Sequence, residues 1–152
     1  MILVRRTFLL SSAAGIGLIL SGCGEDAPNI LTVRAQAGAG MNPGPDGSDR
    51  PVTLSILQLS GSGAFDAADY FALQNPASAL GSDLVKADQL VLAPGGSASR
   101  AITIQPTTSI IGVVGGFINP TGRTVRSKIA APGASQGLII SVGASGLSLA
   151  TA

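Results

Sequence analysis

The N-terminal stretch that ends at Cys23 sets which residues of this chain can form a folded domain. Arg5 and Arg6 precede an apolar run from Phe8 to Leu20, and small residues follow that run. A basic start, a short apolar run and small residues before a cleavage point are typical of a secretory signal. The alternative, a membrane-spanning helix, needs roughly 20 apolar residues, more than this run supplies. We therefore expect residues 1–22 to be a signal peptide.

The tetrapeptide Leu20-Ser21-Gly22-Cys23 resembles the lipobox of bacterial lipoproteins. The resemblance implies that Cys23 becomes the first mature residue and carries diacylglycerol on its thiol and an acyl chain on its amine. Cys23 is the only cysteine, and a secretory signal followed by a free thiol is the alternative. Arg5-Arg6-Thr7-Phe8-Leu9 is similar to part of a twin-arginine export signal, and general secretory export stays equally open. Residues 23–29 are then a short lipidated tether.

Composition narrows the classes of function. Without Arg5 and Arg6 the nine basic residues fall to seven, against eight acidic ones, so nucleic acid is not an expected partner. The chain has no histidine, and acylation would consume its single thiol. The usual ligands of zinc, copper and haem and the commonest general base are therefore absent. We expect no enzyme, no metal and no cofactor apart from the lipid on Cys23.

Alternating apolar and polar residues predict a mainly β domain over residues 30–152. In residues 30–37, for example, Leu31, Val33 and Ala35 fall on one face of a strand. Helical spacing over residues 64–73, with Ser62 as N-cap, and a second short piece over 77–87 predict a small helical insertion at about 64–87. The pattern indicates an antiparallel β-sandwich, with strands at 30–37, 52–59, 89–92, 101–104, 109–118, 123–129, 138–142 and 147–150.

Three short motifs suggest chemistry that the rest of the chain does not support. Gly133-Ala134-Ser135-Gln136-Gly137 fits the nucleophile elbow, but that motif needs a following helix and a histidine. Gly38-Ala39-Gly40 follows a strand like a phosphate-binding turn, yet no helix begins after it. Asp46 and Asp49 supply too few oxygens for a calcium loop. We interpret the last two as solvated turns and expect no catalysis at the first.

Five segments in a fixed order resemble the TssJ family, the outer-membrane lipoproteins of the type VI secretion system (SciN/VasD-like). They are residues 51–59, 65–73, 80–84, 92–95 and 111–117. The match extends from about Asn42 to Arg126, which is most of the mature chain. The chain departs from the family pattern at three places. Ile118 stands where an arginine is usual, Val125-Arg126 where Trp-Arg is usual, and Gly115-Gly116 replaces two alanines.

This resemblance implies a transthyretin-like β-sandwich on the periplasmic face of the outer membrane. It implies binding to the periplasmic domain of TssM, which partners TssL, through the loop between the first two strands. No small-molecule substrate is expected. Composition alone explains the loop, residues 38–50, as turn chemistry, although binding residues often lie on such loops. The candidate contact residues are Met41, Asn42, Pro43, Gly44, Pro45, Asp46 and Gly47.

A second class of function stays open: a periplasm-facing lipoprotein that binds a ligand or glycan on its β-sandwich. Sugars usually stack on aromatic rings, and this chain has one tyrosine, Tyr70, and four phenylalanines, of which Phe8 lies in the signal. Gly24, directly after the cysteine, is consistent with sorting to the outer membrane.

Overall fold

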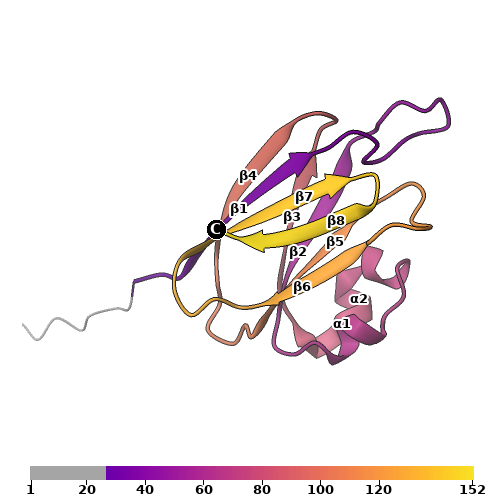
Figure 1. Cartoon of the computed structure of the whole chain (residues 1–152). Coiled ribbons are helices and arrows are strands. Elements are labelled where there is room, and N and C mark those ends of the chain that lie inside the picture. Colours follow the sequence, from indigo (N-terminus) through magenta and orange to yellow (C-terminus); the bar gives the residue numbers. More distant parts are fainter. Residues whose placement is uncertain (1–26) are drawn as a thin grey trace, which may run out of the picture.

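Two four-stranded sheets face each other in the computed structural model, which describes residues 27–152 (Figure 1). The signal peptide, Cys23 and most of the tether fall outside these residues, so the predictions for them stay predictions. The strands are β1 (Ile30–Ala37), β2 (Val52–Leu59), β3 (Leu84–Leu92), β4 (Ser97–Thr103), β5 (Ile110–Gly115), β6 (Arg126–Ala130), β7 (Gln136–Gly143) and β8 (Gly146–Thr151).

The strand order is β4-β1-β7-β8 in one sheet and β3-β2-β5-β6 in the other. Neighbouring strands are antiparallel except for β1 and β7, which are parallel, with Leu31 opposite Gln136 and Ala37 opposite Val142. The predicted mainly β sandwich is thus confirmed, and the parallel pair is a correction within it. Both strands start from the same end of the sandwich, and alternation within a strand says nothing about the direction of its neighbour.

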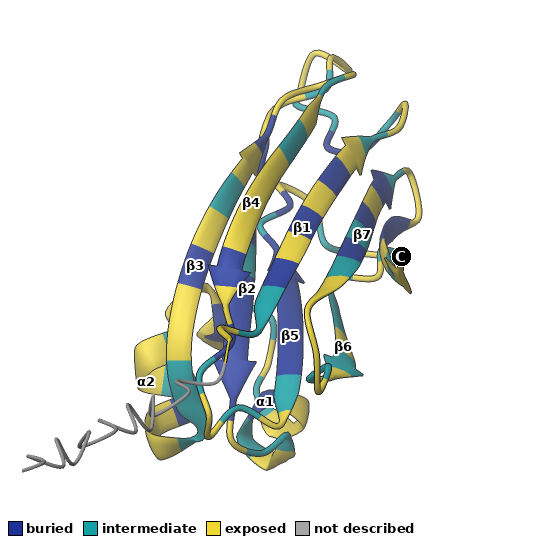
Figure 2. Ribbon diagram, turned by 90° about the vertical axis from the view of Figure 1, so that its left-hand side faces the viewer, coloured by how far each residue is buried: buried dark blue, intermediate teal, exposed yellow. Residues whose placement is uncertain are grey.

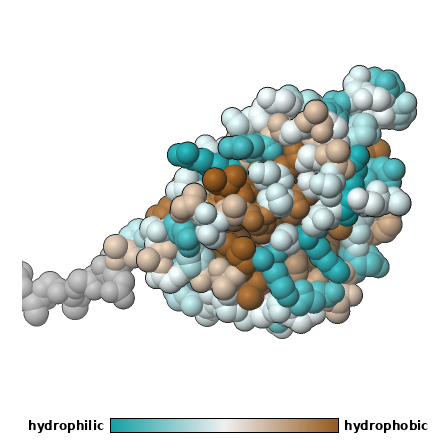
Figure 3. Space-filling view, viewed as in Figure 1, coloured by the Kyte–Doolittle hydropathy of each residue, from teal (hydrophilic) through white to brown (hydrophobic). Residues whose placement is uncertain are grey.

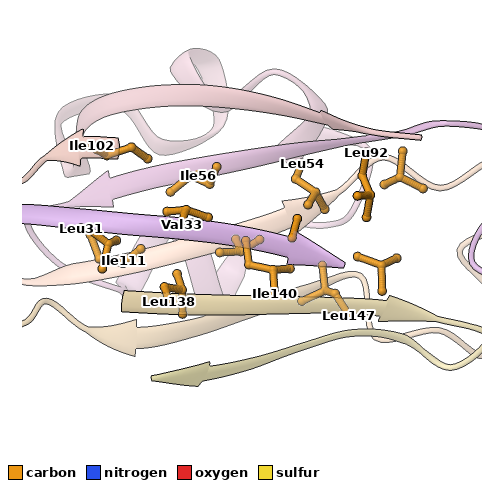
Figure 4. Close-up of a cluster of buried hydrophobic side chains, with 14 of the residues drawn as sticks. Leu31, Val33, Leu54, Ile56, Leu92, Ile102, Ile111, Leu138, Ile140 and Leu147 are labelled. Atoms are coloured by element: carbon orange, nitrogen blue, oxygen red, sulfur yellow. The ribbon is translucent and has the colours of Figure 1, made fainter. Parts of the chain in front are cut away.

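Alternation on the inner strands builds the core between the sheets. On β1, Leu31, Val33 and Ala35 are fully buried while the residues between them face outward, as the colours of Figure 2 show. Apolar side chains of the facing sheet, among them Leu54 and Ile56, meet them in the middle (Figure 4). Removing such surface from water contributes about 25 cal/mol per Å². The core therefore rests on aliphatic residues, as the composition predicts.

Strand β2 is buried on both faces, which explains where the helical insertion sits. Leu57 and Leu59 point away from the sandwich core and pack with Phe65, Leu73 and Leu80 of the insertion in a second cluster. At Gly112 on β5, an added Cβ would lie 2.9 Å from the Phe65 ring. A glycine is therefore needed for this aromatic side chain to lie against the sheet.

The helical insertion is more broken than its sequence period predicts. It contains α1 (Gly63–Ala67), η1 (Ala72–Gln74), α2 (Pro76–Leu80) and η2 (Gly81–Asp83). Arg126 donates to the carbonyl oxygens of Phe65, Asp66 and Ala68, and Ala68 is extended, so α1 ends at Ala67. The Ser62 side chain makes no capping hydrogen bond; Asp83 Oδ2 accepts one from the Ala64 amide at 3.3 Å.

Several predicted boundaries also shift. Residues 84–87 belong to β3 and not to the helical insertion, and β4 begins at Ser97, earlier than predicted. Both stretches lie on edge strands, and neither alternates clearly: residues 84–87 contain one polar residue, Lys86, and residues 97–100 contain one apolar residue, Ala98. The predicted strand over residues 109–118 is shorter, because β5 ends at Gly115. The insertion thus spans residues 63–83.

Lys128→Met should raise the pKa of the Asp66 carboxyl toward its ordinary value of 3.8. Lys128 Nζ donates to both carboxylate oxygens of Asp66, at 2.7 and 2.6 Å, and this hydrogen bond lowers the pKa of Asp66. Because the folded-state pKa is depressed, the pairing stabilises the protein above the ordinary pKa and is lost as pH falls through the lowered one. Titration of the Asp66 carboxyl by NMR measures the change. An Asp66 pKa equal in both proteins would contradict the assignment.

Candidate partner-binding surface

Three connections between strands meet at the end of the sandwich where β1 ends. They are the loop of residues 38–51, the β5–β6 connection of residues 116–125, and the tight turn of the β7–β8 hairpin at residues 143–146. In Figure 1 the loop of residues 38–51 extends furthest from the sheets, on the opposite side of the molecule from the start of the described chain. This end is therefore a projecting surface built from segments far apart in the sequence.

We call residues 38–51 the β1–β2 loop. The tip of this loop is a small hairpin. The Gly44 amide donates to the Ser48 carbonyl at 2.8 Å and the Gly47 amide to the Gly44 carbonyl at 2.9 Å. Asp46 Oδ1 accepts from the Ser48 amide at 3.1 Å. Gly47 has φ +82°, a conformation that other residues rarely adopt. The tip therefore has a defined shape.

Two buried or half-buried side chains hold the base of the loop. Asn42 is 2% exposed; its Nδ2 donates to the Pro51 carbonyl at 3.1 Å and its Oδ1 accepts from the Ile118 amide at 2.9 Å. The Asp49 carboxylate accepts from the amides of Gly40, at 2.9 Å, and Asn42, at 3.1 Å. These bonds satisfy backbone groups that have no ladder partner.

Arg123 joins all three connections. Its Nη1 donates to the carbonyls of Gly40 at 3.0 Å and Met41 at 3.2 Å in the β1–β2 loop, and of Ala144 at 2.9 Å in the hairpin turn. Its guanidinium lies 5.8 Å from the centre of the Phe117 ring, within the range of a cation–π contact. One side chain from the β5–β6 connection thus fixes the other two segments.

A close approach of two backbones supports the same arrangement. The Thr124 amide donates to the Ser145 carbonyl at 2.8 Å, and the Leu147 amide donates to the Thr124 carbonyl at 2.9 Å. A Cβ at Gly146, whose φ is +103°, would lie 2.3 Å from Thr124 backbone atoms. Glycine at this position is therefore required for the hairpin turn to lie against the β5–β6 connection.

The structure divides the predicted contact residues into two groups. Pro45, Asp46 and Gly47 are exposed at the tip, and Pro43 and Gly44 are half-buried beside it.

Met41 and Asn42, also predicted as contact residues, have almost no accessible surface: Met41 is 0% exposed and belongs to the core. Both side chains are turned inward at the loop base, where Met41 packs in the core and the Asn42 side-chain amide hydrogen-bonds to Pro51 and Ile118. They hold the loop in place. Their direct contact with a partner stays a prediction.

The remaining sequence candidates do not converge on a site. The elbow-like residues Gly133–Gly137 lie in the β6–β7 connection and the start of β7, with no following helix. Among residues 27–152, no group of three or more His, Cys, Asp or Glu residues is placed to hold a metal ion. Within the same range, no helix is long and apolar enough to cross a bilayer.

The second function would need aromatic side chains on which a sugar can stack, and among the described aromatic residues only Phe71 is strongly exposed. Phe65 and Phe117 are buried, and Tyr70 and Phe71 meet edge to face with ring centres 5.3 Å apart. The Tyr70 hydroxyl donates to the Phe117 carbonyl at 2.8 Å. Burial raises the pKa of Tyr70 above its ordinary value of 10.0, so the phenol stays a donor at neutral pH.

Arg123→Met should increase hydrogen exchange throughout the β1–β2 loop, by about tenfold or more, because several loop and turn carbonyls lose their donor. The control is Arg50→Met in the same loop, where the guanidinium pairs with Asp46 at 3.2 Å and both side chains are about half exposed. Such a surface pair contributes about 0–1 kcal/mol. Exchange mass spectrometry of peptides covering residues 38–51 measures the effect, and equal exchange in the two variants would contradict the role of Arg123.

Comparison with solved structures places this fold among components of one secretion system. The T6SS lipoprotein TssJ1 from Pseudomonas aeruginosa matches with 30% identity and a TM-score of 0.75, over 83% of this chain and 98% of that one. Serratia marcescens Lip, a membrane bound component of the type VI secretion system, matches with 25% identity and a TM-score of 0.74, over 81% and 98%. A chain of a type VI membrane complex matches with 25% identity and a TM-score of 0.70, over 82% and 99%.

A search of curated proteins found no match. A family model described as T6SS-SciN (type VI secretion lipoprotein, VasD, EvfM, TssJ) matches residues 29–145. That range covers seven of the eight strands, β1 to β7, and the TssJ resemblance of the five ordered segments is thereby confirmed. The chain belongs to the type VI secretion lipoprotein family.

Proposed function

We propose that this chain anchors the trans-envelope complex of a type VI secretion system by binding the periplasmic domain of TssM through its β1–β2 loop. Family membership supports the secretion system, and the likeness to a chain of a type VI membrane complex supports assembly with other envelope proteins. The observation that carries the loop assignment is its geometry: it projects from the sandwich and is fixed at its base by Asn42, Asp49 and Arg123.

A fixed loop suits a permanent contact. Binding costs free energy when loops and long side chains become ordered, and a loop already held in shape avoids much of that cost. Pro45 and Gly47 at the tip have few or no side-chain torsions to restrict. The exposed Asp46 adds a charge to the tip. The tip therefore offers a partner a defined surface without enzymatic chemistry.

In this proposal the lipid on Cys23 holds the domain at the outer membrane, facing the periplasm, and TssL is reached only through TssM. Three residues separate Cys23 from Ala27, and the four steps from one Cα to the next span at most about 14 Å. One acyl chain binds a membrane marginally, and additional chains make attachment stable. Because the loop projects from the side opposite Ala27, it would extend away from the membrane toward its partner.

Asp46→Arg should weaken binding to the TssM periplasmic domain by about tenfold or more, because it reverses the charge and changes the shape of the tip. Asp46 is outside the core, so the fold should persist. The matched control is Ser99→Arg, which places the same side chain on the exposed outer face of β4 and should bind normally. Calorimetry or biolayer interferometry with purified TssM periplasmic domain gives the affinities. Unchanged affinity for Asp46→Arg would remove the loop from the contact.

Cys23→Ser should release the protein from the outer-membrane fraction into the soluble periplasm, because the acyl chains would have no thiol to attach to. The binding of TssM in solution should be unchanged, since the loop is untouched. Density-gradient fractionation of cells followed by immunoblotting measures the location. A Cys23→Ser protein that still co-fractionates with the outer membrane in cells lacking TssM would contradict anchoring by this lipid.

A further inference from the structure

The largest exposed apolar side chains among residues 27–152 are Phe71, Val91 and Ile118, which are 76%, 61% and 56% exposed. Val91 lies on the outer side of edge strand β3, Phe71 lies in the helical insertion, and Ile118 lies in the β5–β6 connection. Val91 is opposite Thr53 on the neighbouring strand, and the Gly116 amide donates to the Thr53 carbonyl at 2.9 Å. We call Phe71, Val91 and Ile118 the outer apolar patch.

Specific contacts hold Phe71 and Ile118 on the same part of the surface. Tyr70 reaches from the helical insertion to the β5–β6 connection, where its hydroxyl donates to the Phe117 carbonyl at 2.8 Å. Phe71 packs edge to face on Tyr70, and Ile118 directly follows Phe117 in the chain. The hydrogen bond thus joins the chain neighbours of Phe71 and Ile118, two exposed apolar residues that are 47 positions apart in the sequence.

The patch is continuous with the β1–β2 loop. The Ile118 amide donates to Asn42 Oδ1 at 2.9 Å, and Asn42 also binds the loop at Pro51. Arg123 lies in the same β5–β6 connection and donates to the carbonyls of Gly40 and Met41 in the loop. Loop and patch are therefore parts of one bonded unit, and a protein seated on the loop would approach Ile118 as well.

The opposite sheet offers a useful contrast. Figure 3 views the face formed by β4, β1, β7 and β8, where hydrophilic residues are interspersed with hydrophobic ones. Ile139 of β7 points outward there but is partly covered, in a hollow with Arg34 and Thr32. Val91, by contrast, is strongly exposed on the outer side of the other sheet, and Phe71 and Ile118 are strongly exposed on the two segments that Tyr70 joins. Such exposure is expected when a partner covers these side chains.

We propose that the outer apolar patch is a second contact surface for the protein that the β1–β2 loop binds, and that it receives an apolar, charge-poor area of that protein. The inference rests on the proposed function, which names this partner as TssM. Aromatic and other large apolar side chains are enriched at the centres of protein interfaces and account for much of the binding free energy. The polar, glycine-rich tip gives shape and charge, while Phe71 and Ile118 supply the apolar area.

Phe71→Ser and Ile118→Ser test the inference, each in the full-length lipoprotein, against the purified TssM periplasmic domain. Each should weaken binding by about tenfold or more, mainly through faster dissociation. Ile139→Ser is the matched control on the opposite sheet and should leave the affinity unchanged. Melting temperatures should change little for the two patch variants, because exposed side chains contribute little to stability.

The outcomes separate the patch from the loop. If Asp46→Arg weakens binding but both patch variants bind as the unsubstituted protein does, the patch inference is wrong and the loop assignment stands. If the unsubstituted protein does not bind TssM, both are wrong. Sedimentation of the protein alone gives a further check. Self-association that Phe71→Ser abolishes would assign the patch to a second copy of this chain and overturn the proposal.

Discussion

The backbone amides and carbonyls of the β1–β2 loop need hydrogen-bond partners, although the loop belongs to neither sheet. This constraint determines how one end of the molecule is built. Peptide groups that leave water without a hydrogen-bond partner cost about 1–3 kcal/mol each. Asn42, Asp49 and Arg123 supply those partners, and each connects the loop either to itself or to another connection. The same bonds that remove this cost also prevent the loop from moving independently of the sheets. The hydrogen bonds that satisfy the loop backbone are thus the same bonds that make the loop rigid.

A buried polar side chain solves the same problem inside the sheets. Gln58 on β2 is 0% exposed, and its Oε1 accepts from the Gln105 amide at 2.8 Å and from the Thr108 hydroxyl at 2.9 Å. Its Nε2 donates to the Thr103 carbonyl at 3.0 Å. The β4–β5 connection, which passes from one sheet to the other, is thereby attached to a strand that is buried on both faces. Both ends of the sandwich use a buried amide to fix a long connection.

Sequence patterns predicted those parts of the fold that depend on neighbouring residues. The bounds of β1 and β2 were predicted correctly because one face of each is apolar at every second position. The helix over residues 64–73 was wrong in its length, because Arg126, some 60 residues later, takes up its carbonyl oxygens. No local signal predicts such a bond. The parallel pairing of β1 with β7 escaped prediction for the same reason.

The candidate surface also shows which features local sequence patterns predict and which depend on residues far apart in the sequence. Turn-forming residues correctly predicted an exposed loop at residues 38–50, but turn propensity does not distinguish a tip residue such as Asp46 from an inward residue such as Asn42. The sequence places Arg123 only at the start of the strand predicted over residues 123–129, and its importance depends on carbonyls about 80 positions away in the sequence. Phe71 was predicted to be part of an amphipathic helix and is instead the most exposed of the large apolar residues.

The exposure of Phe71 and Ile118 is best understood together with the rigidity of the loop. A fixed polar tip loses little entropy on binding but offers little apolar area, so on its own it gives specificity more readily than affinity. Large apolar side chains on a mobile segment would have the opposite weakness. Here the hydrogen bonds of Tyr70 and Asn42 attach the segments that carry these apolar side chains to each other and to the base of the loop. The proposed function, a lasting hold on one partner, needs both properties, and the bonded unit formed by the loop and the β5–β6 connection would provide them on one surface.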